Sequence, residues 1–111
     1  MTIDKKVKRK WLKALRSGKY RQGRGCLRSK GKTFDTFCCL GVLLDITDPK
    51  AWDRTLQSLY LWGTERAECA LPESVRDEIG LDDEEEGTLI TLNDDGGNGF
   101  KRIANWIEKN L

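Results

Sequence analysis

The chain has 111 residues, with twenty Lys and Arg, eighteen Asp and Glu, and a formal net charge of +2. It contains no histidine, which excludes the most common general base near neutral pH and the commonest metal ligand. A hydrophobic fraction of 38% and four tryptophans indicate a folded chain, and the length fits a single domain over residues 1–111. No apolar run reaches about 18 residues, so we expect no membrane span and no secretory leader, and hence a cytoplasmic protein.

The charges are unevenly distributed along the chain. Thirteen of the twenty basic residues fall in the first 32 positions, where the only acidic residue is Asp4. The other 79 residues carry seven basic and seventeen acidic side chains. Such asymmetry indicates either a basic surface for an anionic partner or a basic half docked on an acidic half.

The first predicted element is a helix over residues 5–17, which Asp4 can cap and Gly18 can end. Its apolar residues form one stripe: Val7, Trp11, Leu12, Ala14 and Leu15. Lys and Arg occupy the opposite face. That face is either simply solvated or binds an anion, and the sequence favours neither.

Two short strands are predicted next, over 26–28 and 33–37, around a turn at 29–32. The apolar stretch 37–46 has no polar break before Asp45 and favours a buried helix that starts near Cys38. Asp48 and Pro49 should end that helix. A short strand is expected around 59–62.

The C-terminal part begins with a predicted helix over 71–81, with Pro72 in its first turn and Gly80 at its end. We expect an acidic loop at 82–86, a strand at 88–92 and a glycine-rich turn at 93–97. Asn98 should cap a last helix whose apolar residues share one face: Phe100, Ile103, Ala104 and Ile107. Together these elements predict an α+β fold, a small single domain with three or four helices packed on a short, mainly antiparallel sheet.

The four cysteines are expected to be plain reduced thiols. Cys38 and Cys39 lie in an apolar stretch and should be buried, and no C-x-x-C pair supports a zinc site. We therefore expect no metal and no cofactor. Without histidine, neither the serines nor the cysteines have the partner that a nucleophile needs, so we expect a protein that is not an enzyme.

The best candidate binding site is the stretch from residue 20 to residue 28. Glycine lets backbone N–H groups approach a ligand, and arginine offers a planar fork for phosphate or carboxylate. A tyrosine can stack on a base, and a glutamine can both donate and accept hydrogen bonds. The candidate ligand-binding residues are Tyr20, Arg21, Gln22, Gly23, Arg24 and Arg28.

Two further candidates, Asn93 and Asp94, could supply acceptors for hydroxyl or amino groups of a ligand. They are more often turn and capping residues, and that purely structural role is favoured for them. A structural alternative stands for the stretch 20–28 as well: a basic turn that joins a helix to a hairpin. Its spacing matches neither of the well-known glycine-rich phosphate motifs.

Two patterns in the sequence carry a resemblance to known proteins. The first is Trp11-x-x-Ala14-Leu15-Arg16-Ser17-Gly18-x-Tyr20-x-Gln22-Gly23-x-Gly25-x-Leu27-Arg28, and the second is Phe37-Cys38-Cys39-Leu40-Gly41-Val42-Leu43. In these patterns the chain resembles a family of small uncharacterised proteins found in bacteriophages and prophages, and the resemblance spans nearly all of the chain except the stretch near 47–69. The resemblance implies a phage origin, with the infected bacterial cytoplasm as its location, and says little about activity.

The leading hypothesis is a non-enzymatic binder of a small phosphorylated ligand, a counter-defence sponge that sequesters a nucleotide immune signal. Several phage proteins of this kind close their sites between subunits, so a homo-oligomer is expected. The first alternative is a nucleic-acid-binding accessory protein that uses the basic N-terminal helix and the loop after it. The second alternative is an inhibitor of a host defence protein that binds through the acidic residues near 82–86.

Overall fold

The computed structural model describes residues 3–95 and 97–111, and within them the chain is an α+β domain as predicted. The α-helices of the described residues are α1 (Lys5–Arg16), α2 (Cys39–Thr47), α3 (Glu73–Ile79), α4 (Asp83–Asp94) and α5 (Phe100–Asn110). A short 3₁₀ helix, η1 (Pro49–Ala51), follows α2. The helices are thus more numerous than the three or four expected.

The strands are short and form two small sheets. The first sheet has the order β1 (Arg21–Gln22), β3 (Thr36–Phe37), β2 (Arg28–Ser29), with β1 parallel and β2 antiparallel to β3. The second pairs β4 (Trp52–Asp53) with β5 (Leu61–Trp62) in antiparallel register. A bridge between Ser29 and Leu59 links the two sheets, so β2 runs beside the segment that leads into β5.

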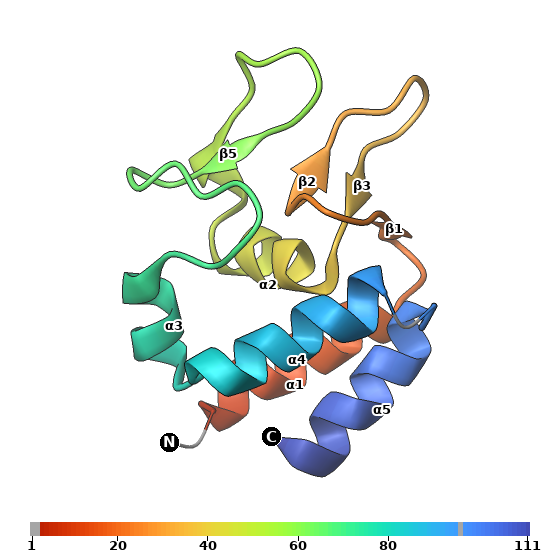
Figure 1. Ribbon diagram of the computed structural model, residues 1–111, viewed down its shortest axis with the longest axis vertical. Helices are drawn as coiled ribbons and strands as arrows, with labels where there is room; N and C mark the ends of the chain where they lie inside the picture. The colour runs from red at the N-terminus through yellow and green to blue at the C-terminus, as the bar shows by residue number, and fades with distance from the viewer. Residues whose placement is uncertain (1–2, 96) are drawn as a thin grey trace.

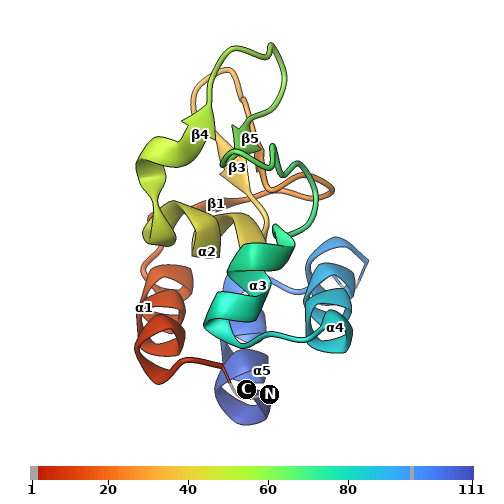
Figure 2. The same ribbon diagram turned by 90° about the vertical axis from the view of Figure 1, so that its left-hand side faces the viewer.

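The molecule has a helical end and a strand end, with α2 between them (Figure 1). Helices α1, α4 and α5 lie at one end, and the strands with their two long loops lie at the other, an arrangement that the perpendicular view also shows (Figure 2). The first six residues of α2 are all buried, because both ends of the molecule pack against them. Helix α2 is therefore the centre of the core.

Helix α1 forms as predicted because its ends and its apolar stripe are both encoded locally. The side chain of Asp4 accepts hydrogen bonds from the backbone N–H groups of Lys6 and Val7, which caps the first turn. Trp11 is fully buried and its indole N–H donates to the Cys39 carbonyl at 2.9 Å. This bond satisfies a buried polar group and fixes α1 against the start of α2.

Helix α2 begins at Cys39, directly after the cap at Cys38, and ends before Asp48 and Pro49 as predicted. Its third residue, Gly41, packs against the backbone of Leu27, and a Cβ at position 41 would overlap the Leu27 carbonyl oxygen. The same carbonyl accepts a hydrogen bond from the Cys38 N–H at 3.2 Å. Only glycine allows α2 to lie this close to the chain that enters β2.

The acidic stretch 82–86 is helical, so the prediction of an acidic loop was wrong. Asp82 and Glu85 form a reciprocal capping box, and acidic side chains in a first helical turn complement the helix dipole. Glu86 is buried, accepts the Leu71 N–H at 2.8 Å and pairs with Arg76 at 2.9 Å, which ties α3 to α4. Asp82, Asp83 and Glu84 remain exposed, but the acids of this stretch stabilise a helix start.

The predicted strand at 88–92 was also wrong, because these residues continue α4. Alternation over five residues is too short to exclude a helix. The buried residues Leu89 and Asn93 are four apart, as on one face of a helix. The predicted turn at 93–97 was wrong for Asn93 and Asp94, which close α4, and Gly96 lies outside the described residues.

The last helix, α5, has the predicted apolar face, but its cap was wrongly assigned. Gly99 occupies the cap position and has no side chain to bond the helix N-terminus. Asn98 instead donates its side-chain N–H to the Leu92 carbonyl at 3.2 Å, which holds the connection between α4 and α5. The fully buried residues of α5 are Ile103, Ala104 and Ile107.

The glycines at 41 and 87 give a matched test of the packing. We expect Gly41→Ala to lower the free energy of unfolding by roughly 2–3 kcal/mol or more, because the new methyl group overlaps backbone that cannot rotate away. Gly87, inside α4, has no atom within 4 Å of an added Cβ. Gly87→Ala should therefore raise the free energy of unfolding by about 0.5–1 kcal/mol. Urea denaturation monitored by circular dichroism measures both, and equal effects of the two substitutions would contradict the close packing.

Candidate anion-binding site

Tyr20, the first of the predicted site residues, follows α1, and its side chain contacts Asp45 and Phe37. Its hydroxyl donates to the Asp45 carboxylate at 2.6 Å, and its ring meets Phe37 edge-on at 4.9 Å between centroids. Burial, and after it the hydrogen bond to Asp45 and the charge of Asp45, raise the pKa of Tyr20 well above its usual range. The hydroxyl therefore stays protonated and the ring keeps a fixed orientation.

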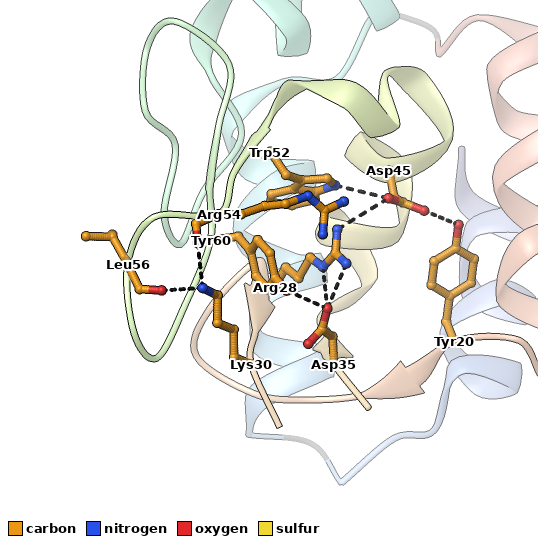
Figure 3. A network of polar contacts seen from close by, with 9 residues as sticks. All are labelled: Tyr20, Arg28, Lys30, Asp35, Asp45, Trp52, Arg54, Leu56 and Tyr60. Atoms are coloured by element: carbon orange, nitrogen blue, oxygen red, sulfur yellow. Dashed lines mark hydrogen bonds and ion pairs between the residues drawn. The ribbon is translucent and has the colours of Figure 1, made fainter. Parts of the chain in front are cut away.

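Arg28 lies at the centre of a polar network, and its guanidinium is fully engaged (Figure 3). It donates from Nε and Nη2 to one oxygen of Asp35, at 3.1 and 2.7 Å, and lies 3.9 Å from Asp45. Its carbon Cζ also lies 4.1 Å from the centroid of the Tyr60 ring. With only 12% of its side chain exposed, Arg28 stabilises the junction of the two sheets and does not face solvent.

The second carboxylate of this network, Asp45, joins three elements. Its two oxygens accept hydrogen bonds from the Trp52 indole N–H at 3.0 Å and from the Tyr20 hydroxyl. The sequence analysis missed its role, and also those of Asp35, Trp52 and Tyr60. One signal was available, since Asp45 is the single acid near the end of a long apolar stretch, and a carboxylate there needs a partner.

The predicted residues Gln22 and Asn93 come together, although they are far apart in the sequence. The Gln22 side-chain amide donates to Asn93 Oδ1 at 3.1 Å and to the Asn98 carbonyl at 2.8 Å. Asn93 is 1% exposed; its Oδ1 also accepts the Cys39 N–H at 3.1 Å, and its Nδ2 donates to the Gly23 carbonyl at 2.9 Å. We call this group the Asn93 junction; it satisfies buried polar atoms of the fold.

Gly23, Gly25 and Asp94 belong to the same region. The Gly25 N–H donates to Asp94 Oδ1 at 3.1 Å, and the same oxygen accepts from Asn93 at 2.9 Å. Gly25 has φ of +86°, a conformation that favours glycine, and an added Cβ on Gly23 would lie 2.6 Å from Thr36 Oγ1. Gly23 therefore packs closely against β3, and the backbone N–H of Gly25 is used internally by α4.

Two of the predicted site residues remain exposed, Arg21 and Arg24. The guanidinium of Arg21 lies over the ring of Phe34 at 4.6 Å, and Phe34 is 50% exposed. Neither arginine forms an ion pair with the described residues. The structure thus divides the predicted set into exposed cations and residues with internal partners.

A groove of about 300 Å³ lies beside Tyr20, between the second half of α1 and the end of α2. Three lysines surround it, and Ala14, Tyr20 and Ile46 supply its apolar surface. No acidic side chain is among its described lining residues, which are Lys10, Lys13, Ala14, Ser17, Lys19, Tyr20 and Ile46. We call it the basic groove; it is at the lower end of the size range of small-molecule sites.

The ion pairs show how the charges of the two parts of the sequence meet in the fold. Among the first 32 residues, only Arg16 and Arg28 form ion pairs within the described chain, with Glu108 and with Asp35 and Asp45. The acids at the start of α4 pair with Arg76 instead. Apart from Arg16 and Arg28, the basic side chains of this segment have no ion-pair partner in the described chain, and these include the lysines of the basic groove.

A comparison with known protein families finds one match. The family model described as a domain of unknown function (DUF8296) matches residues 3–77, more than half of the chain. The chain belongs to this family. No curated protein and no solved structure matches it. The matched range contains the basic groove and the Arg28 network, whereas Asn93 lies outside it.

The remaining findings concern metals and membranes. Among residues 3–95 and 97–111, no three or more Cys, Asp or Glu side chains are arranged to hold a metal ion. Over the same residues, each helix is too short or too polar to cross a lipid bilayer. Burial raises the pKa of the Cys38 thiol to about 11, so this thiol is protonated near neutral pH.

The Asn93 junction predicts a large effect on stability. We expect Asn93→Ala to lower the free energy of unfolding by about 2–4 kcal/mol, because it leaves the Cys39 N–H and the Gly23 carbonyl without partners in the core. Asn105→Ala on the exposed side of α5 is the control and should cost less than about 1 kcal/mol. Chemical denaturation measures both. If Asn93→Ala were as stable as the control, the junction would not be structural.

The Arg28 network predicts a dependence of stability on pH. Burial by itself raises the pKa of Asp35, but the hydrogen bonds from Arg28 and Tyr60 and the charge of Arg28 outweigh it and lower the pKa. A lowered folded-state pKa means that the stabilisation is present above the unfolded-state value, about 4, and is lost as the pH falls below it. Asp35→Asn should lower stability at pH 7 by about 1–3 kcal/mol and weaken the loss on acidification.

Denaturation at about pH 7 and at about pH 3 tests this, since the two values bracket the ordinary carboxyl pKa. The control is Glu78→Gln. It removes an exposed carboxylate of α3 that has no ion pair in the described chain. It should retain the acid dependence of the unaltered protein. The same acid dependence in Asp35→Asn would show that this carboxylate does not couple folding to pH.

Proposed function

We propose that this protein binds a small phosphorylated ligand of the nucleotide class in the basic groove, without catalysing a reaction. The observation that carries the proposal is the convergence of three lysines, without an acid or an ion-pair partner among the described residues, on one groove. Converging like charges raise the local concentration of an oppositely charged ligand. They also repel one another, so a bound anion stabilises the arrangement.

The three lysines come from two turns of α1 and from the segment after it. Lys10 and Lys13 are three residues apart and thus share a face of α1, and Lys19, next to Tyr20 in the sequence, also lines the groove. A lysine ammonium has three donors on a flexible stem, which suits a phosphate group of variable position. Cations from two segments of the chain can contact one or two phosphate groups at the same time.

The apolar surface of the groove favours a ligand that also has a flat or apolar part. Ile46 and the ring of Tyr20 lie beside the lysines. Because Asp45 fixes the Tyr20 hydroxyl, the ring is already in place before any ligand binds, and a preorganised surface loses less entropy on binding. An aromatic base can stack on such a ring. Inorganic phosphate alone would leave this surface unused.

Binding without catalysis is supported by the chemistry of the available groups. The chain has no histidine, and burial holds the thiols of Cys38 and Cys39 in their protonated form. The resemblance to small phage proteins adds a biological setting, a counter-defence sponge that sequesters a nucleotide immune signal in the infected cell. In that setting a homo-oligomer could cover the open side of the groove with a second copy.

The proposal predicts that nucleotides, and not inorganic phosphate alone, raise the melting temperature by several degrees. Isothermal titration calorimetry with the nucleotide that gives the largest shift should then detect one class of site. Lys10→Ala and Lys13→Ala should each weaken its affinity about tenfold or more, because each removes a charge-assisted contact. Lys5→Ala is the matched control, since it removes an exposed lysine of the same helix that does not line the groove.

Salt dependence separates this proposal from the alternative of nucleic-acid binding along α1. A specific observation favours the alternative, since Lys6, Lys10 and Lys13 follow one another along one exposed face of the helix. Duplex DNA bound through six or more cations loses about a thousandfold in affinity between roughly 50 and 200 mM salt. In that case Lys6→Ala, which alters a lysine outside the groove, would weaken binding as much as Lys13→Ala. Binding of neither nucleotides nor DNA would refute the proposed function.

A further inference from the structure

Two of the four cysteines, Cys26 and Cys69, meet at the surface although 43 positions separate them in the sequence. The backbone N–H of Leu27 donates to the carbonyl of Glu68 at 2.8 Å, which places the two cysteines on adjacent strands of chain. Because Cys26 precedes Leu27 and Cys69 follows Glu68, this backbone bond brings the two cysteines side by side, and, after burial and the Glu68 carboxylate, the proximity of Cys26 contributes to a raised pKa of Cys69. Cys69 is exposed and Cys26 is half-buried, so a reagent in solution can reach the pair.

The other two cysteines are committed to the core. Cys38 is buried, and its sulfur accepts the Gly41 N–H at 3.4 Å as the cap of α2. Cys39 is buried, and its thiol donates to the Leu89 carbonyl at 3.6 Å. The structure therefore separates one accessible pair of thiols from two thiols that have structural partners.

The geometry points to a thiol–disulfide modification site formed by Cys26 and Cys69, with a glutathione-type disulfide as the oxidant. The thiolate of Cys26 attacks one sulfur of oxidised glutathione, a protein–glutathione disulfide forms, and one glutathione thiolate leaves and takes up a proton. The thiolate of Cys69 then attacks the sulfur of Cys26 and displaces the second glutathione thiolate. In total the protein loses two S–H bonds and gains one S–S bond, and oxidised glutathione is reduced to two thiols.

The environment of Cys69 affects the rate of this exchange. Its thiol donates to the Glu68 carboxylate at 3.5 Å, and burial together with this carboxylate raises the pKa of Cys69 to about 11. Because the thiolate is the attacking species, exchange is slow near neutral pH and faster in mild base. The neighbouring backbone bond between Leu27 and Glu68 holds the two segments that carry the cysteines side by side.

The bond would connect the loop after β1 to the segment after β5. It would enclose residues 27–68, which include α2 and most of both sheets. A cross-link around so long a segment restricts the unfolded chain strongly, and in the chain-entropy account this raises the stability of the folded state. Oxidation would also fix the position of Arg24 and Gly25, which directly precede Cys26.

The test is to incubate the full chain with oxidised glutathione at about pH 8.5, where the thiolate fraction is larger than near neutral pH, and then to alkylate free thiols under denaturing conditions. We expect two alkylated cysteines instead of four, a linked peptide pair that contains Cys26 and Cys69, and a melting temperature several degrees higher. Reduction with dithiothreitol should restore four reactive thiols and the original melting temperature. This measurement needs no variant.

Two single variants complete the design. In Cys26→Ser, Cys69 should end as a mixed disulfide with glutathione, and in Cys69→Ser, Cys26 should do so, because the resolving thiol is gone. Four alkylated cysteines in the treated protein would overturn the proposal. Two separate glutathione adducts on the unaltered chain, or a bond between Cys26 and Cys38, would overturn it as well. None of these outcomes depends on the ligand of the basic groove.

Discussion

The carboxamide of Asn93 is the contact on which the arrangement of the molecule depends. It lies in the core with both of its polar atoms bonded, and its partners come from β1, from the loop after β1 and from the start of α2. A buried amide without these partners would cost several times what a typical hydrogen bond contributes. These bonds therefore fix the loop after β1, helix α2 and helix α4 relative to one another. The segment that carries Tyr20 directly precedes β1 and is held with them.

The need to pair buried polar groups also explains where the many cations of this chain lie. Where a basic side chain is drawn inward, as at Arg28, two carboxylates and an aromatic ring surround it. Where it is not needed internally, it stays at the surface of α1 or of the segment after it. The fold thereby concentrates cations beside Tyr20 and places Asp83 and Glu86 of α4 beside Arg76. This separation of charge within one domain is the physical basis for proposing an anionic ligand.

The sequence-predicted site and the structural site overlap only in part. Tyr20 belongs to both, because it closes the polar network on one side and borders the basic groove on the other. Gln22, Arg28 and Asn93 form hydrogen bonds within the fold. The residue types alone could not distinguish a side chain that binds a ligand from one that pairs with buried polar groups of the protein. From the sequence, Lys10 and Lys13 were considered only as part of the basic helix, in the alternative of nucleic-acid binding. The groove that they form with Lys19 also needs Ile46 near the end of α2, and this neighbour is known only from the fold.

The sequence by itself determined the features that depend on neighbouring residues: the fold class, the ends of α1 and α2, the left-handed stop of α3 at Gly80 and the apolar face of α5. Local rules describe these well because caps and periodic apolar residues act within one or two turns. The tertiary structure decided the state of residues 82–94, where a capping box and the burial of Leu89 and Asn93 made a helix from an apparent loop and strand. It also decided which cations remain free, because pairing depends on residues such as Asp35 and Asp45 that only folding brings to Arg28.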